Sequence, residues 1–216
     1  MTWSLNELEA ETKKAIRGAG LSWGLSEDGA KAVRWLAAHG IDPLPALDDV
    51  LARHDRRAIA TELKYTETGR LRAGSPICPI VLGATLSDHA YHLLAHTFTA
   101  GPVAQSVLLI PFVAGAARFL KRTLRLDLDG MQLVLTEIGD PVGDLSAVGA
   151  GNLPEVRCQI LTGRLPLSSP RPASSAGIDV DPNSWSRLSA YVHRTYVPAS
   201  ERSRREGAGA GLIDND

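Results

Sequence analysis

The dipeptide Asp129-Gly130 is the feature that most restricts the fold of this chain. It separates two runs with apolar residues in alternation, residues 124–128 and residues 133–135. Asp-Gly accepts positive φ angles at both positions, which the tight turn of a twisted hairpin requires. The sequence therefore predicts two antiparallel strands joined by a type I′ turn.

The first 60 residues carry helix signals. Ser4 and Glu7 have the spacing of a capping box, and the helix that follows is expected to end at Gly18 or Gly20. A second helix is predicted to start after Ser26 and to end at Gly40. A third is predicted to start at residue 42, with proline in its first turn.

The middle of the chain has shorter apolar runs. Residues 77–82, 103–112 and 156–161 are predicted to be buried strands, and residues 88–98 are predicted to be a helix. These segments place a sheet in the centre of the sequence.

The C-terminal part returns to helix. The proline- and serine-rich residues 166–176 predict a loop, Asp181 precedes a proline at a helix start, and Trp185, Leu188 and Tyr191 share one helical face. The overall prediction is an α+β fold with N-terminal helices, a central mainly antiparallel sheet, a C-terminal helix and a glycine-rich tail. We expect a single domain over residues 1–216, with a helical part (1–60), a sheet-containing core (75–165) and a C-terminal helix and tail (181–216).

The composition of the chain argues against some classes of binding partner. The formal net charge is −1 and aromatic residues make up 5%, which argues against a nucleic-acid partner. The most apolar stretch, residues 107–117, is too short to span a bilayer, and the N-terminus lacks the pattern of a signal peptide. Cys78 and Cys158 have no metal or redox spacing. We therefore expect a cytoplasmic protein with two buried thiols and no membrane partner.

Asp88, His89, His92 and His96 form the densest group of titratable side chains. On a helix the three histidines would share one face. Three alternatives remain open: a zinc site, a polar face that lines a groove or an interface, or solvated histidines. Leucine stands where a zinc protease with this spacing needs glutamate.

Two glycine-containing motifs lack the context of an active site. Gly20-Leu21-Ser22-Trp23-Gly24 matches G-x-S-x-G, but a helix rather than a strand precedes it, so we expect a turn in which Trp23 packs inward. Glycines 207–211 have no predicted helix after them, so no dinucleotide site and no cofactor are predicted.

Basic residues and a patterned tail follow the C-terminal helix. Arg194 and Arg204 are weak candidates for ligand binding. We expect residues 207–216 to be ordered and to pack against the Trp23 turn or a partner chain; a flexible end is the alternative. The tail candidates are Gly207, Gly209, Gly211, Asp214 and Asp216.

Short motifs near both ends resemble a known family. They are Trp3-Ser4-Leu5-Asn6-Glu7, Ser22-Trp23-Gly24-Leu25 and Arg34-Trp35-Leu36 near the start, and Arg194-Thr195-Tyr196, Pro198-Ala199-Ser200-Glu201 and Asp214-Asn215-Asp216 near the end. The segments 3–36 and 194–216 resemble an uncharacterised proteobacterial domain-of-unknown-function family. The resemblance implies a bacterial cytoplasmic protein with a glycine-rich tail. It implies no activity and no catalytic residue.

The function that these features favour is small-molecule binding or an accessory role in metabolism. One alternative is an enzyme without a common cofactor motif, hydrolytic or metal-assisted through the histidine segment. Another is an oligomerisation or scaffolding module, with a homo-oligomer as its product. A pocket with perturbed titratable groups would favour the enzyme, and a pocket without them would favour binding.

Overall fold

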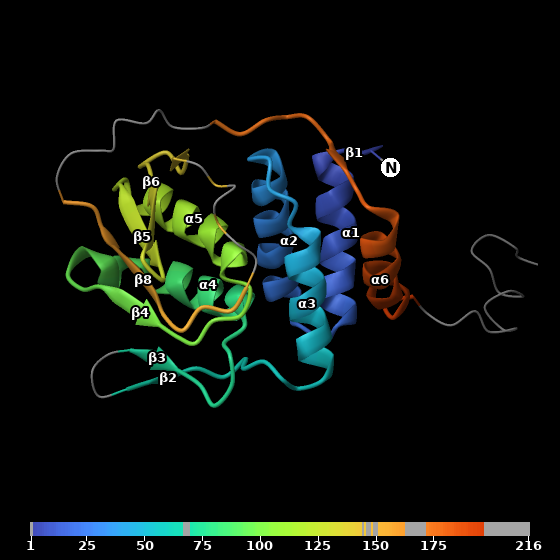
Figure 1. Cartoon of the computed structure of the whole chain (residues 1–216), viewed down its shortest axis with the longest axis horizontal. Helices are drawn as coiled ribbons and strands as arrows, with labels where there is room; N and C mark the ends of the chain where they lie inside the picture. Colours follow the sequence, from blue (N-terminus) through green and yellow to red (C-terminus); the bar gives the residue numbers. More distant parts are fainter. Residues whose placement is uncertain are drawn as a thin grey trace, which may run out of the picture.

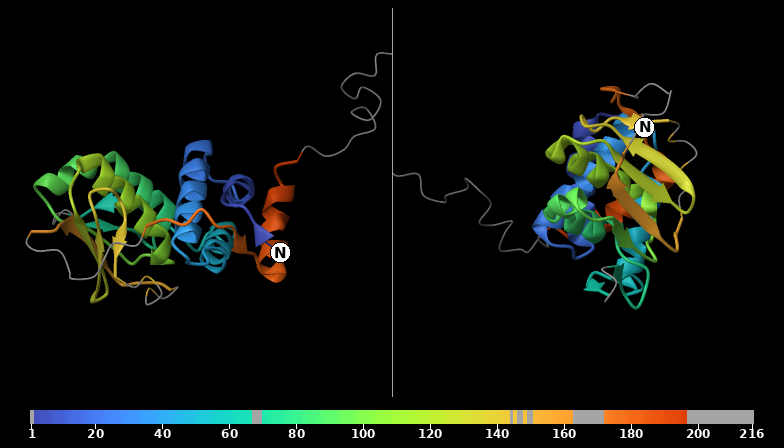
Figure 2. Two further views of the ribbon diagram at one scale, coloured as in Figure 1. Left: turned by 90° about the horizontal axis from the view of Figure 1, so that it is seen from above. Right: turned by 90° about the vertical axis from the view of Figure 1, so that its left-hand side faces the viewer.

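The computed structural model describes residues 2–66, 70–143, 145, 148, 151–162 and 172–196. Four helices form one group and a sheet with two further helices forms another, side by side (Figures 1 and 2). The first group contains α1 (Leu5–Gly18), α2 (Trp23–Ala38), α3 (Leu44–Asp55) and α6 (Pro182–His193). The second contains α4 (Pro79–Asp88), α5 (Ile110–Leu120) and the short 3-10 helices η1 (Ala90–Leu94) and η2 (Ser106–Leu109). The predicted α+β class is confirmed.

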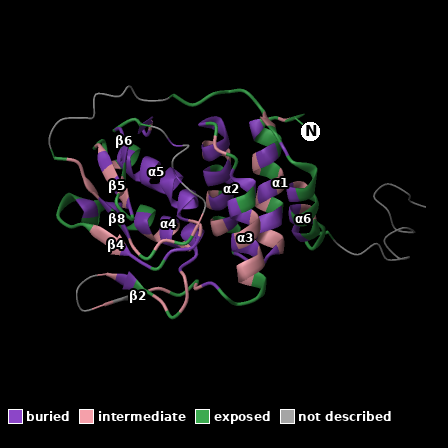
Figure 3. Cartoon of the chain, viewed as in Figure 1, coloured by how far each residue is buried: buried purple, intermediate pink, exposed green. Residues whose placement is uncertain are grey.

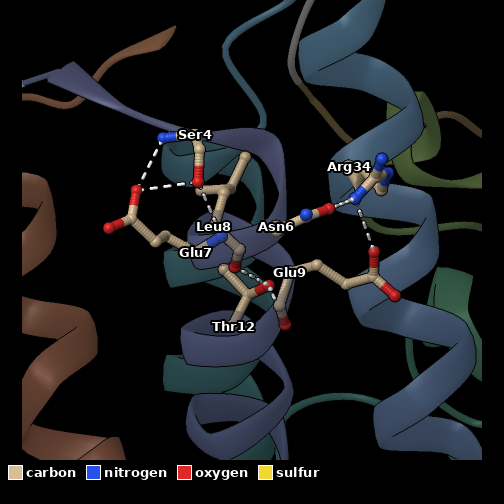
Figure 4. A network of polar contacts seen from close by, with 7 residues as sticks. All are labelled: Ser4, Asn6, Glu7, Leu8, Glu9, Thr12 and Arg34. Carbon is tan, nitrogen blue, oxygen red and sulfur yellow. Dashed lines mark hydrogen bonds and ion pairs between the residues drawn. The ribbon is translucent and has the colours of Figure 1, made fainter. Parts of the chain in front are cut away.

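The N-terminus of α1 has the predicted capping box (Figure 4). The Glu7 amide donates to Ser4 Oγ at 3.2 Å, and the Ser4 amide donates to Glu7 Oε2 at 2.8 Å. Arg34 of α2 donates to Asn6 and, at 3.2 Å, to Glu9 of α1. These bonds satisfy the first amides of α1 and fasten it to α2.

The second helix begins earlier than predicted. Ser22 rather than Ser26 caps α2, because Ser22 Oγ accepts a bond from the Leu25 amide at 3.3 Å. Ser26 lies one turn further on, and its hydroxyl donates to the Ser22 carbonyl at 2.7 Å. The third helix begins at Leu44, whose amide donates to Asp42 Oδ1 at 3.0 Å, so its start differs from the prediction by two residues.

The strands form a two-stranded sheet, β1 with β9, and a larger sheet. The strands within the described residues are β1 (Thr2–Trp3), β2 (Lys64–Tyr65), β3 (Leu71–Arg72), β4 (Phe98–Ala100), β5 (Leu124–Leu128), β6 (Met131–Leu135), β7 (Pro141–Val142), β8 (Val156–Ile160) and β9 (Ile178–Asp179). The larger sheet has the order β2-β3-β4-β8-β5-β6-β7, and among its described pairs only β3–β4 is parallel. The mainly antiparallel prediction is therefore confirmed.

The predicted hairpin is confirmed in detail. Strands β5 and β6 pair in the expected register, with Leu128 opposite Met131. The φ angles of Asp129 and Gly130 are +54° and +90°. The Gly130 amide donates to Asp127 Oδ1 at 2.9 Å, which closes the turn.

Two predicted strands are wrong. In the segment 77–82, Ile77 makes isolated bridges and Pro79 opens helix α4. In the segment 103–112, Val103 makes similar bridges and the rest forms η2 and the start of α5, with Pro111 in the first turn. A continuous apolar run buried on all sides has no periodicity that separates strand from helix, and a proline then marks a helix start.

One face of the larger sheet is covered and the other is polar. Helix α5 packs on β5 and β6, and most of its residues are buried (Figure 3). Leu124, Leu126 and Leu128 of β5 point into this core, while Arg125 and Asp127 lie on the opposite face. No helix in the described part of the chain covers that polar face (Figure 2).

Helix α2 joins the two groups. It packs on α1 and also on α4 and α5. At Gly29 the approach is close: a Cβ there would lie 2.8 Å from Ile16 Cδ1 of α1 and 3.0 Å from Ile80 Cδ1 of α4. A side chain at this crossing would have to displace the ends of both isoleucine side chains.

Helix α6 starts at the predicted Asp181-Pro182 signal, with Asp181 Oδ2 accepting from the Ser184 amide at 2.8 Å. It packs on α1 and α3. The predicted glycine-rich tail lies outside the described residues. Within the described residues, no helix has the length and apolar character needed to cross a membrane.

Replacing Gly130 with valine tests the turn. A β-branched residue resists a φ of +90°, so we expect a loss of about 1–2 kcal/mol of unfolding free energy. Gly130→Asn is the control, since asparagine tolerates left-handed angles, and it should cost less. Equal urea midpoints for wild type and Gly130→Val would contradict the turn.

Replacing Gly29 with valine tests the helix crossing. Overpacking against two isoleucines should cost about 1–3 kcal/mol in a urea unfolding experiment. Gly24→Val in the same helix is the matched control, because a Cβ at Gly24 has no other atom within 4 Å. The crossing does not require glycine if both variants unfold at the same midpoint. For wild type we expect one cooperative transition, in line with the single-domain prediction.

Candidate functional site

The histidine segment does not form the predicted helix. Helix α4 ends at Asp88, His89 caps it through an Nδ1 contact of 2.9 Å with the Thr85 carbonyl, and His92 lies in η1. His96 precedes β4, and all four side chains are exposed. Because the chain changes from α to 3-10 geometry, the prediction that the three histidines share one helical face is wrong.

A metal site in this segment gains no support. The rings of His89 and His92 lie edge to face with centroids 5.7 Å apart. Among the residues that the structure describes, no group of three or more His, Cys, Asp or Glu side chains is arranged to hold a metal ion. A ligand-binding role for Asp88, His89, His92 and His96 stays a prediction.

The G-x-S-x-G match is a helix start. Ser22 uses its hydroxyl to cap α2. Trp23 is 64% exposed, so the expectation that it packs inward is wrong; Leu21 takes the buried position instead. The Arg17 guanidinium lies 5.1 Å from the Trp23 ring centre. Contact between Trp23 and the tail is a prediction on residues outside the described part.

Arg194 belongs to a defined polar contact. Its Nη1 and Nη2 donate to the two carboxylate oxygens of Asp55, each at 2.8 Å, which joins α6 to α3. These bonds lower the pKa of Asp55 below its ordinary value. The guanidinium also lies 4.5 Å from the ring centre of Tyr191, whose own pKa is raised by burial. Arg204, Gly207, Gly209, Gly211, Asp214 and Asp216 lie outside the described residues.

Both cysteines are buried, as predicted, and are poor nucleophiles. Burial raises the pKa of the Cys158 thiol to about 12 and raises that of Cys78 as well. Their positions in the core indicate packing rather than chemistry.

An open trough lies below the C-terminal end of α3. It consists of two adjoining cavities that both touch Thr61. The first, of about 510 Å³, is lined by Ala60, Thr61, Glu62, Lys64, Arg72, Ala73 and Gly74. The second, of about 360 Å³, is lined by Ala19, His54, Asp55, Arg57, Ile59 and Thr61. The Asp55–Arg194 pair therefore stands at one end of the trough.

A left-handed residue turns the chain from α3 into the trough. Arg57 has a φ of +54°, and the Ala58 amide behind it donates to the Arg53 carbonyl at 2.9 Å. This is a C-terminal helix cap in which glycine would be the usual residue. The chain then runs beside residues 76–78, where Ala60 bonds to Pro76 and Cys78 at 2.8 and 2.9 Å.

Two cations face each other in the trough. Lys64 of β2 and Arg72 of β3 are direct partners in the antiparallel register, and both line the larger cavity. Within the part of the chain that the structure describes, neither has a carboxylate within 4 Å. Like charges opposite each other destabilise a strand pair.

The local charge of the sequence carries a signal for this site. Residues 53–72 hold six Lys or Arg residues against three Asp or Glu residues, a local excess in a chain of net charge −1. The excess alone does not show which cations lie together. That information comes from the pairing of β2 with β3.

A second, smaller pocket lies where α2 meets α4 and α5. Its volume is about 180 Å³, and its lining contains two aromatic residues, Trp35 and Phe112, together with charged residues at its edge. It shares no lining residue with the trough.

The Asp55–Arg194 pair generates a pH prediction. Because the pKa of Asp55 is lowered in the folded state, the pair stabilises the protein above about pH 4 and loses this effect as the pH falls further. Arg194→Gln should raise the pKa of Asp55 in an NMR titration and should cost about 0.5 kcal/mol at pH 7, since the pair is largely exposed.

The control for this titration is Arg187→Gln. Arg187 also lies on α6, but its ion pair is with Asp48, at 2.5 Å. The pKa of Asp55 should not change in this control. An unaltered Asp55 pKa in Arg194→Gln would show that the bidentate contact is not formed in solution.

A search of curated proteins found no match to the chain. A family model does match: residues 3–76 fit the family described as a protein of unknown function (DUF3726). The expected resemblance to an uncharacterised domain family is thus confirmed for the N-terminal segment 3–36, while the segment 194–216 lies outside the match. All lining residues of the trough, from Ala19 to Gly74, lie inside it. The N-terminal third of the chain is therefore similar to the domain of unknown function DUF3726.

Proposed function

We propose that the protein binds a small anionic molecule in the trough. The observation that carries this proposal is the pair Lys64 and Arg72, two cations opposite each other on β2 and β3 and without a carboxylate partner in the described chain. An oxyanion between the two side chains would replace a repulsive contact by two attractive ones.

The charges along the trough support an anion with two negative charges. Arg57, Lys64 and Arg72 supply three cationic side chains, and Glu62 supplies one carboxylate. Asp55 lines the trough too, but its charge is already compensated by Arg194. A phosphoryl group or a dicarboxylate matches this excess, because guanidinium groups bind both through paired hydrogen bonds.

The shape of the larger cavity supports a small ligand. Its volume of about 510 Å³ falls in the usual range of small-molecule sites, about 300–1,000 Å³. Ala60, Ala73 and Gly74 line it between the charged side chains, so the backbone is accessible. The charged residues thus lie around a space that a ligand of metabolite size would fill.

The proposal covers a binding or accessory role rather than catalysis. None of the described lining residues forms a nucleophile–base pair, and neither the enzyme nor the scaffolding alternative gains an observation in its favour. The resemblance at the chain ends and the two buried thiols support a bacterial, cytoplasmic setting as part of this proposal.

Isothermal titration at low ionic strength tests the proposal. The probes are inorganic phosphate, pyrophosphate and succinate. Wild type should bind at least one of them, with an affinity that falls as salt is added. Lys64→Gln and Arg72→Gln should each weaken binding about tenfold or more, a change of about 1.4 kcal/mol. Arg125→Gln, on the polar face of the sheet, is the control and should bind as wild type does.

The two variants that should weaken ligand binding should also make the ligand-free protein more stable. Without a ligand, Lys64→Gln and Arg72→Gln should each raise the free energy of unfolding by a few tenths of a kcal/mol, because a like-charge contact is removed. A gain in stability together with a loss of binding is expected when residues are retained for ligand binding at a cost in stability. The proposal is wrong if no probe binds, or if both variants bind as tightly as wild type.

A further inference from the structure

We propose that the pocket between α2 and α5 is a second ligand site, which takes a single aromatic ring bearing a carboxylate. Its lining residues come from α2, α4 and α5, and none of them lines the trough. These three helices lie beside one another in Figure 1. The inference does not depend on the anion site, because the two share no residue.

The aromatic walls are held in place before a ligand arrives. Trp35 is half-buried and stacks on His39 with ring centres 3.8 Å apart. Phe112 lies so close to α4 that a Cβ at Gly83 would be 2.3 Å from its ring. Neither ring can move far without disturbing its neighbours, which lowers the entropy cost of binding.

The space in front of these rings is left open by Gly115. A glycine inside a helix costs about 1 kcal/mol relative to alanine, and close packing usually explains it. At Gly29 and Gly83 that explanation holds, whereas a Cβ at Gly115 would have no other atom within 4 Å. Gly115 lines the pocket, so any larger side chain there would occupy the volume of the ligand.

The charges at the pocket favour an anionic substituent. Arg118 and Lys31 both line it, and in the described chain neither has a carboxylate within 4 Å. Asp28 supplies the one opposing charge. The stem of Arg118 packs on Gly139, where a Cβ would lie 2.9 Å from Arg118 Cγ. This contact restricts the stem of Arg118.

The volume of the pocket is sufficient for one ring. An enclosed apolar cavity of about 150 Å³ is enough to hold benzene. The pocket measures about 180 Å³ and is open to solvent, which leaves room for a ring with a short carboxylate. An aromatic face against Trp35 and a carboxylate near Arg118 use both features of the lining.

Benzoate is the probe that tests this inference. The indole Nε1–H signal of Trp35 in a ¹⁵N-labelled sample, assigned with Trp35→Phe, should shift and saturate as benzoate is added. Benzylamine has the same ring with the opposite charge and should bind at least about tenfold more weakly. Equal or tighter binding of benzylamine overturns the choice of an anion.

Two glycine variants distinguish benzoate binding in the pocket from binding elsewhere on the surface. Gly115→Leu fills the pocket and should abolish the benzoate-dependent shift, while Gly24→Leu, also at a helical glycine with an open Cβ position, should leave it unchanged. Spectral dispersion and the phosphate titration of the trough report whether Gly115→Leu is folded. If Gly115→Leu is unfolded, Gly115→Ala and Arg118→Gln replace it, and both should weaken benzoate binding. No shift at Trp35 in wild type, or benzoate affinity that survives in a folded pocket variant, overturns the inference.

Discussion

The close crossing of α1, α2 and α4 at Gly29 is the contact on which the arrangement depends. The terminal methyl groups of Ile16 in α1 and Ile80 in α4 both lie close to this glycine, and α2 packs on α1 as well as on α4 and α5. Both candidate sites follow from this arrangement. The pocket lies along α2 where it meets α5, and the trough lies where the chain leaves α3 for the first strands of the sheet.

The trough differs from the neighbouring face of α3, where three arginines form ion pairs. Around α3, arginines pair with carboxylates: Arg53 with Asp49 at 2.7 Å, Arg187 with Asp48 at 2.5 Å and Arg194 with Asp55 at 2.8 Å. A few residues further on, Lys64 and Arg72 oppose each other and have no carboxylate partner in the described chain. An external anion is the simplest partner for such a pair.

Local signals predicted much of the fold, and non-local pairing decided the rest. The capping box of Ser4 and the turn at Asp129-Gly130 act over four residues, so their sequence patterns were sufficient. The runs at 77–82 and 103–112 were assigned wrongly because residues buried on every side lose the alternation that identifies a strand. The site escaped prediction for a related reason: Lys64 and Arg72 meet only through the register of two-residue strands, which leave almost no pattern. The histidines were misjudged because α4 ends at Asp88, the residue at which the predicted helix was expected to begin.

Amide mapping by NMR during a phosphate titration tests the central claim most directly. If an anion binds between β2 and β3, the ¹H–¹⁵N signals of residues 57–64 and 72–74 should shift along saturable curves, and those of residues 89–96 and 125–128 should not. Shifts that centre on the histidine segment or the polar sheet face, or that rise without saturation, would contradict the account.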